Sequence, residues 1–119
     1  MINNLPLIEE KIINHIDQDK ESCGLIIEKD DLELDFLGLK NFSNKRDFFE
    51  ISPKDFLNIK SNYNIRYIFH THLSALSVNF SYLDKKISEL LCIDGLLYII
   101  PIKRFKIYLH KKDEELWLK

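Results

Sequence analysis

The stretch HTHLSALSVNFSYLD, residues 70–84, contains side chains that can bind and use a metal ion. His70 and His72 are two residues apart, so in a strand both imidazoles project from one face and can share an ion. Ser81 and Asp84 are three residues apart, which at a helix start places them on one side of the first turn, where the helix dipole favours a carboxylate. Asp84 is therefore a third candidate ligand.

The chemistry that these residues suggest is metal-assisted hydrolysis. Two neutral imidazoles and one carboxylate would leave the fourth position of a tetrahedral zinc ion open for water, as a hydrolytic site requires. Zinc lowers the pKa of its bound water to about 7, and a carboxylate that is not a ligand must then accept the proton. The pattern predicts a zinc hydrolase whose general base comes from elsewhere in the chain.

Each half of this pattern also has a purely structural explanation. Two histidines at a strand end are commonly exposed polar residues, and Ser-X-X-Asp is a variant of the helix capping box. The chain repeats that spacing at Ser52 and Asp55, where no histidine is close in sequence. Only the combination of histidines, serine and aspartate therefore favours a metal site over a strand followed by a capped helix.

The segments around the pattern predict the elements that must position it. IRYIFHTH, residues 65–72, alternates as a strand and ends at the two histidines. A helix is expected to begin at Ser81 and to end at Asp94-Gly95. The apolar residues that we expect on its buried side are Leu83, Ile87, Leu90 and Leu91.

The segments before residue 65 predict two further helices and a hairpin. Residues 5–16 are amphipathic, and the apolar side of this expected helix consists of Leu5, Ile8, Ile12, Ile13 and Ile16. CGLIIEK and LELDFLGL, residues 23–29 and 32–39, predict an antiparallel hairpin. FFEIS, residues 48–52, predicts a short strand, after which Ser52 caps a helix that begins at Pro53.

The last third of the chain predicts two strands, LLYIIPI and FKIYLH, residues 96–102 and 105–110. The position of Trp117 is not indicated. The order helix, strands, helix, strand, helix, strands is typical of an α+β or three-layer sandwich fold. Residues 1–119 show no internal repeat, linker or low-complexity segment, which predicts a single domain.

The composition limits the classes of function. The 17 basic and 19 acidic side chains are interspersed and give a net charge of -2, which argues against a nucleic acid partner. No apolar run reaches the length of a bilayer, so no membrane partner is expected.

The start MINNLPLIEE lacks a basic segment leading into an apolar one, which favours a cytoplasmic location. Cys23 and Cys92 are therefore expected as small buried apolar residues and not as a disulfide.

Several segments resemble the motifs of one enzyme family. KESCGLII, residues 20–27, resembles the first motif of the JAMM metalloproteases, also called MPN-plus or JAB domains. KNFSNKRDFFEISPKDF, residues 40–56, resembles the segment that prokaryotic and phage members carry before the histidines. HTH with Ser81 and Asp84 resembles the His-Ser/Thr-His and Ser-X-X-Asp signature, and LLYIIPIKRFKIYLH is similar to the closing strand pair. The resemblance covers nearly the whole chain in the right order.

This resemblance implies a fold, a site and an activity. The fold would be the MPN/JAB fold, a cytidine-deaminase-like α-β-α sandwich around a mixed sheet. His70, His72 and Asp84 would hold zinc, Glu21 would be the general base and Ser81 would donate to the oxyanion. The substrate would be a peptide or isopeptide bond in an extended C-terminal tail of a ubiquitin-like protein, or a phage tail-associated substrate. A phage-encoded member would be virion-associated and have phage tail proteins as partners.

The chain departs from the family pattern after the second histidine. Leu73 replaces the usual proline, and residues 73–80 form a gap one residue longer than usual. The alternative function is therefore a catalytically weak or inactive MPN-like scaffold in a phage tail or another protein assembly. A thiol hydrolase built from Cys23 with His15 or His110 is a weaker alternative, because nothing in the sequence places a base beside the thiol.

Overall fold

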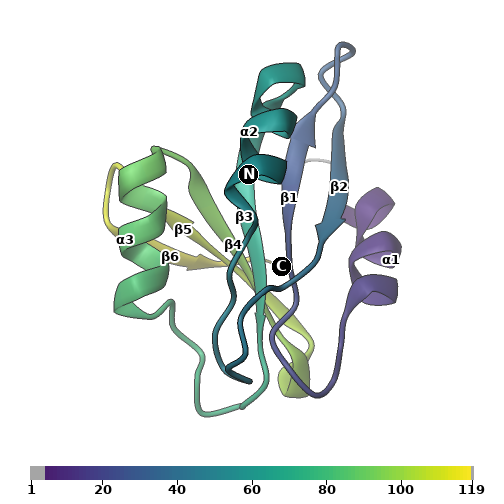
Figure 1. The fold of residues 1–119 in the computed structure, drawn as a ribbon. Coiled ribbons are helices and arrows are strands. Elements are labelled where there is room, and N and C mark those ends of the chain that lie inside the picture. The colour runs from purple at the N-terminus through teal and green to yellow at the C-terminus, as the bar shows by residue number, and fades with distance from the viewer. Residues whose placement is uncertain (1–4, 119) are drawn as a thin grey trace.

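The computed structural model describes residues 5–118, in which six strands form one mixed sheet with three helices against it (Figure 1). In chain order the elements are α1 (Leu5–His15), β1 (Cys23–Glu28), β2 (Leu34–Leu39), α2 (Pro53–Asn62), β3 (Asn64–His72), α3 (Tyr82–Leu91), β4 (Asp94–Ile99), a 3₁₀ turn (Ile100–Ile102), β5 (Arg104–Leu109) and β6 (Glu114–Trp117). The strand order is β2-β1-β3-β4-β5-β6, with β3 and β4 parallel and the other neighbours antiparallel. The expected α+β class with a mixed sheet is confirmed.

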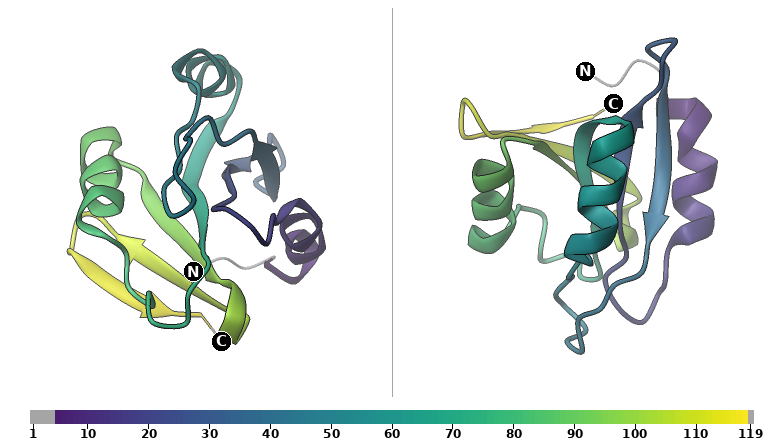
Figure 2. Two further views of the ribbon diagram at one scale, coloured as in Figure 1. Left: turned by 60° about the horizontal axis from the view of Figure 1, so that its bottom comes forward. Right: turned by 45° about the horizontal axis from the view of Figure 1, so that its top comes forward.

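The helices cover both faces of the sheet, with α1 on one side and α2 and α3 on the other (Figure 2). Ile8 of α1 packs in an apolar cluster that includes the buried Phe69 of β3. On the opposite face, Phe56 of α2 and Ile87 of α3 pack against a second cluster that includes Ile68. The central strand β3 is thus covered on both faces and is buried from Tyr67 to His72.

The α1 helix follows its predicted amphipathic pattern with one exception. Ile8 and Ile12 are buried and Ile16 packs against their cluster, whereas Ile13 is 42% exposed. The side chain of Leu5 lies outside the described residues. With 11 residues, α1 is the longest described helix, and no helix within residues 5–118 is long and apolar enough to cross a membrane.

A β-bulge in β3 determines which side chains share the face of the histidines. Ile26 of β1 pairs with Tyr67 and the next residue, Ile27, pairs with Ile65, so Arg66 is an extra residue in β3. The bulge changes the alternation of the strand, because the extra residue shifts every later side chain to the opposite face. His70 therefore lies on the face that α2 and α3 cover.

The predicted buried side of α3 is wrong. Leu83, Leu90 and Leu91 are exposed, while Asp84 and Ser88 are buried and Ile87 is half-buried. The helix begins as predicted, since Ser81 caps it and forms a complete capping box with Asp84. The contacts of Asp84 with the histidines rotate α3 so that this carboxylate, and not the leucine side, faces the sheet.

The predicted end of α3 is also displaced, and with it the environment of one cysteine. Cys92 ends the helix in the left-handed conformation, with φ of 55°, and Asp94 and Gly95 already belong to β4. Cys92 is exposed, which corrects the prediction that both cysteines are buried apolar residues; Cys23 is fully buried.

The predicted strand at residues 48–52 is absent from the described fold, and a loop organised by Asn41 takes its place. The Asn41 side-chain amide donates to the carbonyl oxygens of Glu21 and Phe48, and its Oδ1 accepts from the amides of Ser43 and Glu50. These side-chain bonds satisfy backbone groups that strand pairing would otherwise satisfy. The same side chain thereby fixes the backbone of Glu21.

The C-terminal strands extend the sheet beyond the predicted pair. The expected strand at residues 96–102 stops at Ile99, because Pro101 lies in the 3₁₀ turn that follows and cannot donate a ladder hydrogen bond. The sequence also gave no indication of β6, which pairs with β5. Within β6, Trp117 lies under the cationic groups of Arg104 and Lys106.

Replacing Asn41 by alanine should destabilise the protein by about 3 kcal/mol, since each buried polar group left without a partner costs about 1–3 kcal/mol. Urea unfolding of Asn41→Ala measures this loss. Asn44→Ala, in the exposed part of the same loop, is the control and should leave the free energy of unfolding nearly unchanged. Equal effects in the two variants would contradict the role assigned to Asn41.

Candidate metal centre

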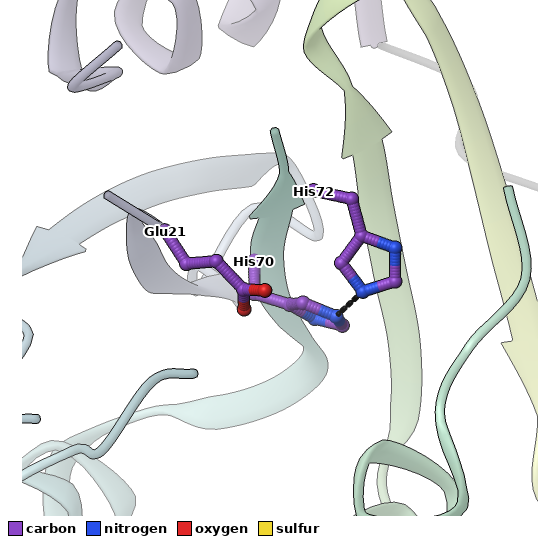
Figure 3. A group of neighbouring side chains, drawn as sticks. All are labelled: Glu21, His70 and His72. Carbon is purple, nitrogen blue, oxygen red and sulfur yellow. Dashed lines mark hydrogen bonds between the residues drawn. The ribbon is translucent and has the colours of Figure 1, made fainter. Parts of the chain in front are cut away.

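The end of β3 and the segment before β1 bring three buried ligand groups together. One oxygen of Glu21 and one nitrogen each of His70 and His72 lie within 4.8 Å of one another. Figure 3 shows the Glu21 carboxylate directed towards the two imidazoles, whose Nε2 atoms are 3.3 Å apart. The antiparallel pairing explains this proximity, because Cys23 lies opposite His70 and the backbone continues in register towards Glu21.

A side chain from the other face of β3 fixes this register at the site. The backbone amide of Ser22 donates to Oγ1 of Thr71, and the amide of Thr71 donates to the carbonyl of Ser22. Thr71 is fully buried and lies between the two histidines in sequence. The residue that points away from the site therefore locks the segment that carries Glu21, just before β1, to the strand that carries His70 and His72.

Asp84 completes the cluster from the first turn of α3. Its Oδ2 atom lies 3.0 Å from Nε2 of His70 and 3.4 Å from Nε2 of His72. The same oxygen accepts a hydrogen bond of 2.9 Å from the backbone amide of Ser81. The capping box and the contacts with the histidines are therefore made by one carboxylate, so the capping role of Asp84 does not prevent it from facing the histidines.

The three atoms Nε2 of His70, Nε2 of His72 and Oδ2 of Asp84 form a nearly equilateral triangle with sides of 3.0, 3.3 and 3.4 Å. Zinc binds nitrogen and oxygen ligands at about 2.0–2.1 Å, so the edge of its coordination tetrahedron is about 3.3 Å. The triangle thus has the dimensions of one face of a zinc site. The donor set and the spacing both fit a zinc ion.

The hydrogen bonds of His72 orient its ring for metal binding. Its Nδ1 lies 2.7 Å from the carbonyl oxygen of Ser77, which can only accept, so Nδ1 carries the proton and Nε2 directs its lone pair into the cluster. The ring of His70 stacks on Phe49 at 4.7 Å between centroids and meets the edge of Phe80 at 5.7 Å. Both imidazoles are therefore held in fixed orientations.

The surroundings of the two carboxylates in the cluster shift their pKa values in opposite directions. Burial raises the pKa of Glu21 to about 8, although His72 opposes this and Asp84 adds to it. Burial alone would also raise the pKa of Asp84, but His70, His72 and the Ser81 amide outweigh it and hold this pKa far below its usual value. Asp84 is thus the carboxylate that stays charged, and the pKa of Glu21 lies close to neutral pH.

The cluster opens into a cleft of about 660 Å³. Glu21, His72 and Ser81 line it together with Arg46 and Asp47, and the remaining lining residues are Leu73, Ser74, Leu76, Ser77, Val78 and Asn79. Oγ of Ser81 accepts from the Asp84 amide, so its O–H proton can still be donated into the cleft. The cleft therefore gives a bound molecule access to Glu21, His72 and Ser81.

The thiol alternative finds no support in the geometry. Burial raises the pKa of Cys23 to about 12, which disfavours the reactive thiolate. His15 contacts the Cys23 carbonyl oxygen through Nε2, and His110 forms a short contact with Asp94. Neither ring is engaged with the thiol in these contacts.

The five residues singled out in the sequence all lie at this centre, with Glu21, His70, His72 and Asp84 buried and Ser81 on the rim of the cleft. Residues that the sequence did not indicate support them, above all Asn41, Thr71 and the carbonyl of Ser77. No protein-family model matches the chain, and no curated protein matches it. The assignment of the site rests on its own geometry.

The metal-free protein should lose stability as the pH rises from 4.5 to about 8. Unfolded, Glu21 ionises near 4.5, but folded it retains its proton up to a pKa of about 8, so the unfolded state binds fewer protons in this window. His72 acts in the same direction. Burial alone would lower the pKa of its ring, but the hydrogen bonds to Asp84 and Ser77 outweigh this and raise it, and the resulting stabilisation is lost as that proton leaves.

Urea unfolding in the presence of a chelator, repeated across this pH range, measures the effect. The free energy of unfolding should fall with pH in the wild type and fall less steeply in Glu21→Gln, which cannot ionise at this position. Identical slopes in the two proteins would contradict the raised pKa of Glu21.

Proposed function

We propose that this protein is a zinc-dependent peptidase or isopeptidase of the JAMM type. The observation that carries the proposal is the triangle of His70, His72 and Asp84, whose sides of 3.0–3.4 Å fit one face of a zinc tetrahedron. The fourth position would face the cleft, next to Glu21 and Ser81. The resemblance of the sequence motifs to this family assigns the same residues to the same roles.

Each residue would have one task in the hydrolysis of an amide. Bound zinc would lower the pKa of a water molecule and polarise the scissile carbonyl. Glu21 would accept the proton of the attacking water and pass it to the leaving nitrogen as the carbon–nitrogen bond breaks, which leaves a carboxylic acid and an amine. The hydroxyl of Ser81 would donate to the oxyanion that develops on the carbonyl oxygen.

The shape of the cleft supports an extended substrate. Residues of two loops line it, Arg46 and Asp47 from one and residues 73–79 with the exception of Ala75 from the other, together with Glu21, His72 and Ser81. An extended protein tail can enter such a cleft, while a folded domain cannot reach the buried cluster. We therefore infer a C-terminal tail, such as that of a ubiquitin-like protein or a phage tail-associated protein, as the substrate.

Metal content and cleavage test the roles of Glu21 and His72 separately. The wild type should bind one zinc ion and cleave members of a panel of ubiquitin-like fusions. Glu21→Gln should keep the zinc and lose cleavage, because it removes only the base. His72→Ala should lose both, because it removes a ligand.

The other results have definite meanings. A wild type that binds no zinc would refute the enzyme proposal, and equal metal loss in both variants would make Glu21 a ligand and not the base. One bound zinc without any turnover would instead favour the alternative of a scaffold that keeps the metal.

Ser81→Ala should lower kcat by roughly 10²–10³-fold while zinc stays bound, because an oxyanion donor is worth about 3 kcal/mol in the transition state. The variant also removes a helix cap, which costs about 1 kcal/mol of stability. Ser52→Ala is the matched control, since the Ser52 side chain likewise accepts from the amide three residues on, that of Asp55, at the start of α2. Steady-state kinetics that show equal losses in both variants would leave Ser81 no role beyond capping.

A further inference from the structure

Lys106 on β5 is a buried lysine whose ammonium group faces the loop between β3 and α3. Its Nζ atom donates to Oδ1 of Asn79 at 2.7 Å and to the carbonyl oxygen of Val78 at 3.1 Å. It also forms an ion pair of 3.5 Å with Glu115 and lies over the ring of Trp117. A buried charge persists only where several partners compensate its desolvation, and here two of them are loop residues.

Glu115 holds the end of the same loop. Its Oε1 accepts a hydrogen bond of 2.8 Å from the backbone amide of Phe80, and its Oε2 pairs with Lys85 at 3.1 Å. Lys106 and Glu115 thus bind three consecutive residues, 78–80, from two neighbouring strands. The last residue before the helix cap is therefore attached to the sheet and not only to α3.

The loop in turn contacts each proposed ligand. The carbonyl of Ser77 accepts from Nδ1 of His72, and the ring of Phe80 lies against His70. Ser81, the next residue, donates to Asp84. Any displacement of residues 77–80 would therefore change the ring orientation of His72, the packing of His70 and the position of Asp84 together.

We propose that Lys106 is a positioning residue for the metal centre, which holds residues 77–80 so that the Ser77 carbonyl fixes the tautomer and orientation of His72. The inference rests on the proposed function, since it assigns an additional residue to the same centre. The loop has no proline and residues 74–77 are exposed, so its own packing does little to fix it. The ammonium group supplies the attachment that the loop lacks.

Lys85 provides a matched control on the same carboxylate. Both lysines pair with Glu115, but Lys106 alone of the two has bonds to loop residues in the described structure. Lys106→Met keeps the long stem against Trp117 and removes the ammonium, and Glu115 keeps its contacts with Lys85 and Phe80. Lys85→Met removes an equal charge from the other lysine that pairs with Glu115, and this lysine side chain has no bond to residues 77–80 in the described structure.

Three measurements on the 119-residue chain test the proposal. In Lys106→Met, cobalt(II) should bind roughly 10-fold more weakly, at the lower end of the losses seen when a ligand's hydrogen-bond partner is disturbed. The amides of residues 77–80 should exchange faster with deuterium. Side-chain ¹⁵N shifts of His72, recorded without metal at alkaline pH, should change from one tautomer to a mixture. Lys85→Met should match the wild type in all three.

A second variant keeps the proposal testable if Lys106→Met does not fold. Asn79→Ala removes the shortest bond of Lys106 from an exposed position and should reproduce the three changes in weaker form. The proposal is overturned if Lys106→Met lowers only the melting temperature, or if its loop exchange and His72 tautomer equal those of Lys85→Met. If the wild type binds no cobalt, the metal proposal fails, while loop exchange and tautomer still decide whether Lys106 positions His72.

Discussion

One carboxylate oxygen, Oδ2 of Asp84, connects the elements that meet at the site. It accepts from the backbone amide of Ser81 and lies 3.0 and 3.4 Å from the two imidazoles of β3. The first turn of α3 is thereby fixed to the end of β3 through a single atom. The orientation of α3 follows from this contact, because the helix turns its polar side inward and leaves leucines such as Leu90 exposed.

Local signals in the sequence predicted the elements whose stability is decided locally. The caps at Ser52 and Ser81, the hairpin of β1 and β2 and the strand that ends at the two histidines all depend on neighbouring residues, and the structure contains them. The prediction failed where a distant polar group decided the outcome. Apolar periodicity suggested the wrong face of α3, because periodicity does not reveal a buried ion pair. Residues 48–52 form a loop and not a strand, because the Asn41 side chain binds the backbone of Phe48 and Glu50 in place of a neighbouring strand.

The site residues likewise divide into those that local spacing indicates and those that long-range pairing brings in. The spacing of His70, His72, Ser81 and Asp84 is visible in 15 residues, but the approach of Glu21 depends on the register between β1 and β3. Its place in the site came from a motif resemblance and could not have come from spacing. The role of Lys106 could not be predicted from the sequence. A charged residue within the alternating strand segment FKIYLH does indicate, however, that an inward position needs a polar partner.

The bulge at Arg66 has a consequence for how the chain can vary in length. Because it sets which face the later residues of β3 occupy, removing one residue between it and His70 would turn both imidazoles towards α1 and leave Asp84 facing apolar side chains. Residues 74–76 are exposed and precede Ser77, whose carbonyl holds His72, so a change in length is expected to be tolerated best within them. The length of the strand segment between Arg66 and His72 is therefore constrained by the site, whereas the length of the exposed turn after it is not.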